Sequence, residues 1–152
     1  MFRRWAEERL YKKTMQLAVA ELRRAARTSN ALEKLHSLEV AEQRLKDAAW
    51  LKPDRVIEKY KVGIQEIERS RMKALQDQAR PAIDRLLDAV EKGVGEREVM
   101  LEAVGLLLAF LHHYLPDDPD VQAHSARFRQ FGGKQQPYVP IQPLSEIYHR
   151  PE

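Results

Sequence analysis

The feature that most constrains this chain is the stretch 99–115, whose side chains are apolar on every side of a helix. Such a helix has no polar face to turn toward water, so we expect other elements to cover it all round. It is shorter than the roughly 20 residues that a membrane span needs, and Glu102 and the pair His112–His113 interrupt it. The stretch therefore predicts the central helix of a helical bundle and no membrane span.

Turn-forming residues divide the rest of the chain into further segments with apolar residues at helical spacing. The pattern predicts helices over about 4–27, 30–51, 54–92, 96–114 and 119–131. The pair Arg80–Pro81 leaves two alternatives open, because proline either kinks a long helix or occupies the first turn of a new one. No alternating strand pattern precedes the tail. The fold class is therefore all-α, a bundle of four to five helices around a central apolar helix, with an extended Pro-rich C-terminal tail.

Local signals predict where these helices begin and end. Asn30 followed by Glu33 has the spacing of a capping box, and Pro53 suits a first helical turn. The sequence Gly93–Gly95 predicts a left-handed cap and a chain reversal, and Asp118 predicts the N-cap of the last helix. We therefore expect the helix boundaries to follow these residues.

The apolar spacing also predicts which side chains point inward. On the first helix the inward residues are Tyr11, Met15, Ala18, Leu22 and Ala25, widened by Leu10, Leu17, Val19 and Ala26. On the second they are Leu32, Leu35, Leu38, Ala41, Leu45, Ala48 and Ala49. On the third they are Ile57, Tyr60, Ile64, Ile67, Ala74, Leu75 and Ala79.

The composition is that of a globular chain, with 43% apolar and 32% charged residues among 152. The absence of cysteine rules out disulfides and thiolate metal sites. The first residues lack the apolar core of a secretory signal, so we expect a cytoplasmic protein. Charge is uneven, with a net +5 over residues 1–30 and −6 over residues 81–120. The simplest interpretation is that these two regions face each other within the fold.

The C-terminal tail is unusual because it combines prolines with large apolar side chains. Pro137, Pro140, Pro143 and Pro151 exclude a helix through most of it and favour extended backbone. Free linkers are poor in apolar residues, yet the tail carries six that we predict to bind a partner: Tyr138, Val139, Ile141, Leu144, Ile147 and Tyr148. We therefore expect a helical bundle over 1–131 and a docking tail over 132–152. After a flexible Gly132–Gly133 hinge, the tail lies either on its own bundle or on a neighbouring chain.

Catalytic and metal-binding signals are weak. Glu33 and His36 have the spacing of a carboxylate–histidine metal pair, but the second pair that such a site needs falls in the tail. A second acidic and histidine-rich group surrounds the end of the apolar helix: His112, His113, Asp117, Asp118, Asp120 and His124. Adjacent histidines point about 100° apart on a helix and do not readily share an ion. No nucleophile elbow or phosphate loop occurs. We therefore expect no catalytic residue, no metal and no cofactor, and hence no enzyme.

The first helix is basic, and its cations are possible nucleic-acid contacts: Arg3, Arg4, Arg9, Lys12 and Lys13. The nearby Trp5 also suits a membrane surface. Glu7 and Glu8 dilute the positive charge, so a solvated helix face is the simpler interpretation.

Together these features predict a non-enzymatic protein-interaction module, an adaptor or small subunit of a larger assembly. Its partner is another protein or a second copy of the chain, and we expect a homo-oligomer. Gly105 and Ala109 would let another helix approach closely, either within the subunit or across a dimer. The alternative is a nucleic-acid-associated accessory protein that uses the basic first helix.

Overall fold

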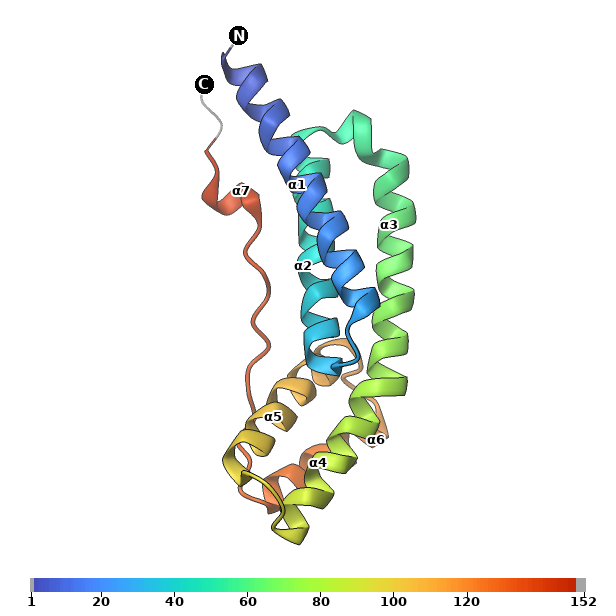
Figure 1. Ribbon diagram of the computed structural model, residues 1–152, viewed down its shortest axis with the longest axis vertical. Coiled ribbons are helices and arrows are strands. Elements are labelled where there is room, and N and C mark those ends of the chain that lie inside the picture. Colours follow the sequence, from blue (N-terminus) through green and yellow to red (C-terminus); the bar gives the residue numbers. More distant parts are fainter. Residues whose placement is uncertain (1, 150–152) are drawn as a thin grey trace. The chain divides into compact units, whose positions relative to one another are not determined.

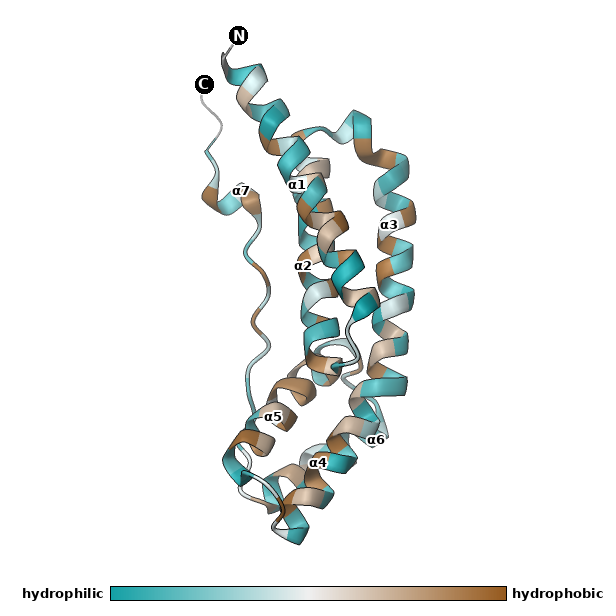
Figure 2. Ribbon diagram, in the orientation of Figure 1, coloured by the Kyte–Doolittle hydropathy of each residue, from teal (hydrophilic) through white to brown (hydrophobic). Residues whose placement is uncertain are grey.

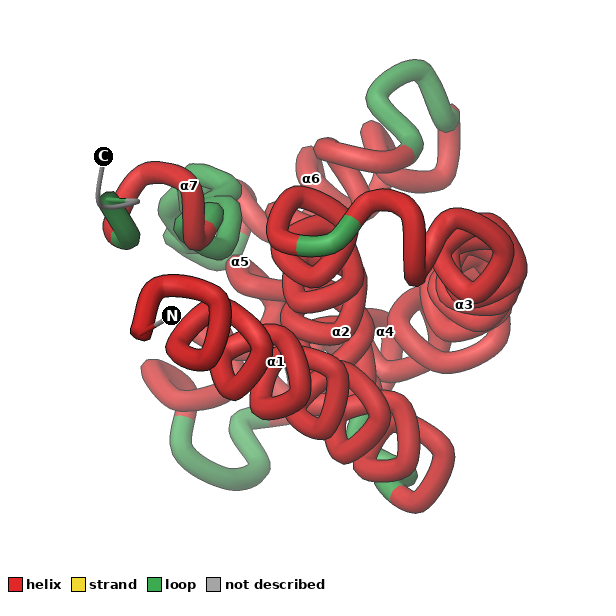
Figure 3. Tube along the Cα trace, turned by 90° about the horizontal axis from the view of Figure 1, so that it is seen from above, coloured by secondary structure: helices red, strands yellow, loops and turns green. Residues whose placement is uncertain are grey.

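The computed structural model describes residues 2–149, and within that range it is all-α with no β-strand (Figures 1 and 3). Met1 and residues 150–152, which include Pro151 of the predicted tail, lie outside the described residues. The α-helices are α1 (Phe2–Arg27), α2 (Ala31–Leu51), α3 (Pro53–Ala74), α4 (Arg80–Lys92), α5 (Arg97–Tyr114), α6 (Pro119–Gln130) and the short α7 (Leu144–Ile147). The all-α prediction is confirmed.

The predicted helix ends are confirmed where capping groups were identified. The Glu33 N–H donates to Asn30 Oδ1 at 3.1 Å, and α3 begins at Pro53. Gly93 adopts a left-handed conformation with φ of 69° and caps α4. Asp118 caps α6 by accepting from backbone N–H groups. Local chemistry therefore sets these boundaries.

The Asp118 carboxylate is held in its charged form. Burial raises its pKa, but hydrogen bonds from the backbone of Val121 and Asp120 and the positive charge of Arg80 outweigh this effect. The pKa of Asp118 consequently lies below its usual value. The cap thus depends on ionisation of this side chain.

A π-helical turn, Leu75–Ala79, resolves the two alternatives left open at Arg80–Pro81. The backbone continues from α3 through this turn into α4, and the Arg80 N–H donates to the Leu75 carbonyl, five residues earlier. Pro81 then stands in the first turn of α4, where its missing N–H is tolerated. The wider turn lets the chain remain helical in spite of the proline ring.

The chain divides into two compact units, each described here by itself. Unit 1 contains residues 1–29, 36–72 and 140–152, and unit 2 contains residues 30–35 and 73–139. The expected boundary between residues 131 and 132 is a different division and stays a prediction.

In unit 1, α1, α2 and α3 bury one apolar cluster: Ala18, Ala25, Leu38, Ala41, Leu45 and Ile67, with Met15, Leu22 and Tyr60 against it. The predicted stripes of α1 and α2 are largely confirmed, but the expected widening of the α1 stripe is wrong at Leu17 and Val19, which are 45% and 40% exposed. It is also wrong at Ala26, which is exposed. Leu17 and Val19 lie on the two flanks of the helix.

Of the inward residues predicted for the third helix, Ile67, Ala74, Leu75 and Ala79 are buried, and the prediction is wrong at Ile57. Ile57 is 55% exposed, and Val56, at 1%, is buried instead. The reason is that Gly63 lies on the inward face, where a Cβ would come within 2.7 Å of Leu45 Cδ1. Close approach of α2 and α3 therefore sets the rotation of α3, which the apolar spacing alone did not show.

A buried ion network also joins α2 and α3. The Arg71 guanidinium, 10% exposed, lies 3.5 Å from Glu39 Oε1 and 2.5 Å from Glu42 Oε2. A buried charge is tolerated only when it is paired and hydrogen-bonded. Arg71 therefore occupies an inward position where the sequence predicted only apolar side chains.

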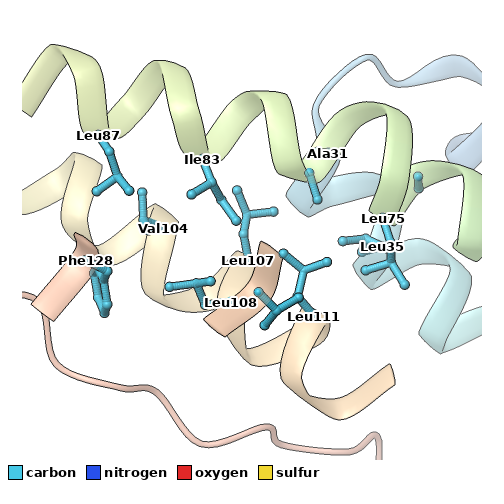
Figure 4. Packing of buried hydrophobic residues seen from close by; sticks show 13 residues of the cluster. Ala31, Leu35, Leu75, Ile83, Leu87, Val104, Leu107, Leu108, Leu111 and Phe128 are labelled. Atoms are coloured by element: carbon cyan, nitrogen blue, oxygen red, sulfur yellow. The ribbon is translucent and has the colours of Figure 1, made fainter. Parts of the chain in front are cut away.

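Unit 2 buries a second cluster, and the side chains of α4 and α5 point toward one another within it (Figure 4). Its members are Ala31, Leu35, Ala74, Leu75, Ala79, Ile83, Leu87, Val104, Leu107, Leu108, Leu111, Val121 and Phe128. Hydrophobic residues dominate α5 (Figure 2). Even so, Val99 and Leu106 are 58% and 36% exposed, so the expectation that α5 is covered all round is wrong at these two positions.

Acidic residues of α4 are paired with basic residues of α6. Arg127 Nη2 donates to Asp88 Oδ1 at 2.6 Å and to Glu91 Oε2 at 3.1 Å. His124 Nε2 lies 2.8 Å from Asp84 Oδ1. Part of the acidic charge of residues 81–120 is therefore matched inside unit 2.

Candidate interaction surfaces

The turn at Gly132–Gly133 is packed, in contrast to the flexible hinge expected from sequence. Gly132 has φ of 83°, and the Gly133 N–H donates to the Phe128 carbonyl at 3.0 Å. A Cβ added at Gly133 would overlap the Phe128 ring. Both glycines are therefore needed for the chain to turn here.

Beyond this turn, Tyr138 docks on α5 within unit 2. Its ring stacks on His113 with centroids 3.8 Å apart, and it meets Phe110 edge-on at 5.8 Å. Its hydroxyl lies 3.4 Å from that of Tyr114. Gly105 provides room for the same segment, because a Cβ there would come within 3.0 Å of Gln136 Cγ. Gly105 thus gives room both to the tail and to α6, because Phe128 Cζ would lie 3.3 Å from the added Cβ, and the approach of a helix from a second copy stays a prediction.

The last part of the tail docks on α2 within unit 1, and Asp47 anchors it. Asp47 is 2% exposed, and its Oδ1 accepts from the backbone N–H of Leu144 and from Gln43 Nε2, both at 2.9 Å. Trp50, one turn further along α2, meets Tyr148 edge-on with ring centroids 6.3 Å apart. The aspartate thus caps α7 from a distant part of the chain.

The six predicted partner-binding side chains divide into two groups. Tyr138, Ile141, Leu144 and Tyr148 are partly buried. Val139 and Ile147 are 77% and 54% exposed. Within each unit the tail contacts helices of its own chain, and docking of the tail on a neighbouring chain stays a prediction.

The predicted nucleic-acid contacts lie at the surface of α1. Arg3, Arg4, Arg9, Lys12 and Lys13 are all exposed. Arg9 lies over the Trp5 ring at 5.4 Å. Glu8 accepts from Arg55 Nη1 of α3 at 2.6 Å, and this bond, together with the positive charges of Arg55 and Lys12, lowers the pKa of Glu8 against the effect of burial. Glu7 lies 3.8 Å from Arg3.

The histidines considered as metal ligands have separate partners. His112 Nε2 lies 2.6 Å from Ser125 Oγ, His113 stacks on Tyr138, and His124 is paired with Asp84. Within residues 2–149, no three histidine or carboxylate side chains come together as a metal site. The His112–Ser125 contact was not foreseen, and because Ser125 is 1% exposed its hydroxyl is closed to a substrate in this conformation.

Comparison of the chain with protein-family models, with curated proteins and with solved structures finds no match. Among the helices within residues 2–149, none combines the length and the apolarity that crossing a membrane requires.

Proposed function

We propose that the chain is a non-enzymatic protein-interaction module, an adaptor or small subunit of a larger assembly, and that its tail forms the contact surface. The observation that carries the proposal is the docked tail with Val139 and Ile147 left facing outward. Full burial of a side chain of this size contributes roughly 1.5–3 kcal/mol. A partner that covers either side chain therefore gains from its burial without unfolding any part of the chain.

The tail is also ordered before a partner arrives. Stacking of Tyr138 on His113 and the bond from Leu144 to Asp47 hold it along the helices. Association is weakened by the entropy of ordering a flexible segment, so an anchored tail favours tighter binding than a free one. Anchored side chains on one side and exposed ones on the other suit an interaction surface.

Unit 2 extends this surface on α5. Val99, Leu106 and Phe110 are seven and four residues apart and share one face of the helix, and Phe110 contacts Tyr138. Val99 and Leu106 are exposed. A partner with an apolar patch, either another protein or a second copy of this chain, would cover these side chains together with Val139.

The test compares two double variants of the full chain. Val139→Ser with Ile147→Ser removes the outward side chains of the tail, while the control Ile57→Ser with Val94→Ser removes side chains of similar exposure elsewhere, at 55% and 62%. Proteins that co-purify from the native source and self-association by light scattering are measured for both. Association lost only in the tail variant supports the proposal. Equal association in both variants contradicts it.

A further inference from the structure

The outward side of α1 carries a basic face made of two groups of cations, with no cation among residues 14–22 between them. Its members are Arg9, Lys12, Lys13, Arg23, Arg24 and Arg27, all of them exposed. With 100° between successive residues, they fall within an arc of about 120°. This arc lies opposite Ala18 and Ala25, which are 0% and 3% exposed in the core of unit 1. The basic face therefore points directly away from α2 and α3.

No acidic side chain of α1 interrupts this face. Glu7, Glu8 and Glu21 are each partly buried toward the inward side, and Glu8 is bound to Arg55. The dilution expected from Glu7 and Glu8 is confirmed at the start of α1, where Glu7 pairs with Arg3 and Glu8 feels the charge of Lys12, and it does not extend to Arg23, Arg24 and Arg27. In the part of the chain that the structure describes, no ion pair engages the five cations beyond Arg9.

Stability does not account for such an arrangement. Arg9 and Lys13, and likewise Arg23 and Arg27, are like charges four residues apart, and such pairs destabilise a helix. A surface that serves only solubility carries positive and negative side chains interspersed with one another. A row of cations with no acidic neighbour instead matches a polyanion.

We propose that this face of α1 binds the phosphate backbone of a nucleic-acid duplex. The cations form two groups, one centred near Lys12 and one near Arg24, and about 20 Å of helix separates them. The second group surrounds a hollow of about 420 Å³ lined by Ala20, Arg23, Arg24, Arg27 and Thr28. Arginine forks recognise phosphate oxygens with two parallel bonds, so this hollow suits a backbone phosphate.

Two other anionic partners fit the face less well. A membrane-surface helix inserts a continuous apolar side, but that side of α1 is already packed on α2 and α3, and the exposed Leu17 and Val19 lie on opposite flanks of the cations. Single strands are held by aromatic rings on which bases stack. Among the side chains that the structure describes, Trp5 is the one aromatic near the basic face, and Arg9 already lies over it.

The test measures binding of the full chain to a fluorescent duplex of about 20 base pairs, roughly 70 Å long, by anisotropy over salt concentrations. The probe variant is Arg23→Gln, Arg24→Gln and Arg27→Gln. The control is Lys73→Gln, Arg85→Gln and Lys92→Gln, which removes the same total charge from exposed positions of unit 2. Circular dichroism confirms that both variants keep their helices.

We expect affinity to fall steeply with salt, with a logarithmic slope near −5 for about six phosphate contacts. The probe variant should bind the duplex about tenfold or more weakly, and the magnitude of its slope should be smaller by about three. The control variant should keep the affinity and the slope of the unmodified chain. Three results would overturn the proposal: no binding at low salt, equal losses in both variants, or binding to phosphatidylserine vesicles without binding to the duplex.

Discussion

Replacing Asp47 by alanine should release the end of the tail while leaving the helices of unit 1 folded. The carboxylate is almost fully buried, and its Oδ1 holds the backbone N–H of Leu144 at 2.9 Å. Its other donors, Gln43 and Arg44, lie on the same helix and are partly exposed. Those two side chains can turn to water, so the main loss falls on the tail.

The size of the effect follows from this one contact. A hydrogen bond to a charged acceptor contributes about 1.5–3 kcal/mol, which corresponds to a change of about 10- to 150-fold in the docked population. The four residues of α7 are too few to form a stable helix alone. What remains is the contact between Trp50 and Tyr148, for which about 0.5–1.5 kcal/mol beyond buried area is typical.

Amide hydrogen exchange followed by NMR measures this release directly. In the unmodified chain, the N–H of Leu144 is bound to Asp47, and that of Tyr148 donates to the Leu144 carbonyl at 2.7 Å. Protection of both amides should fall by the factor given above in Asp47→Ala. The control Gln43→Ala removes another donor and should leave both protected. Unchanged protection at Leu144 and Tyr148 in Asp47→Ala would refute the role of this carboxylate.

Three further predictions concern stability. Leu107→Ala should lower the free energy of unfolding by about 2–5 kcal/mol in urea titration, because Leu107 is 3% exposed. The control is Leu106→Ala, at the neighbouring position that is 36% exposed. If Leu107→Ala lowers the free energy of unfolding no more than Leu106→Ala does, Leu107 is not in the core. Arg71→Ala should cost about 3–5 kcal/mol in the same assay, since it removes the guanidinium that pairs with the buried Glu39 and the part-buried Glu42, and Arg71→Met should recover part of that loss. The pKa of Asp118 is lowered in the folded chain, so its carboxylate stabilises the fold above the unfolded value of about 3.9, and the contribution is lost as pH falls through the folded value. Thermal melts of Asp118→Asn should accordingly lose less stability below pH 4 than the unmodified chain, and parallel curves would contradict this.

Helix limits were predictable because their causes are local. The capping residues act on backbone groups within one turn, as Asn30, Pro53 and Asp118 do. Their effect can therefore be predicted from the adjacent sequence. The π-helical turn Leu75–Ala79 was not predictable in the same way. Pro81 signals that an α-helical bond is missing, but whether a helix kinks, restarts or widens depends on what packs around it.

Three inward positions of α3, Val56, Gly63 and Arg71, were missed for a related reason. Apolar periodicity counts large apolar side chains, whereas the inward line of α3 also contains Gly63 and Arg71. A glycine there allows Leu45 to approach, and an arginine there is balanced by carboxylates of α2. Neither residue looks buried until the neighbouring helix is in place.

For the tail, too, the sequence predicted that it packs on a surface but not which residue holds it there. Its apolar side chains marked it as a segment that lies on a surface, and the structure places Tyr138 and Leu144 against helices. The residue that anchors it could not be found in this way. Asp47, between a lysine and an alanine in a helix, looks like a surface residue, and its role depends on a donor 97 positions away.

The net charge of a region of the sequence can be interpreted only after the charges that are paired within the fold have been discounted. Residues 1–30 and 81–120 are comparably unbalanced, yet Asp84 and Asp88 of the acidic region bind His124 and Arg127 inside unit 2. The outward cations of α1 have no such carboxylate partners among residues 2–149. Salt should therefore weaken the pairs between α4 and α6 and relieve repulsion along α1. Cations on a helix surface that have no carboxylate partner within the fold are available to bind an external polyanion. The basic face of α1 meets this condition, and we therefore propose it as the nucleic-acid contact.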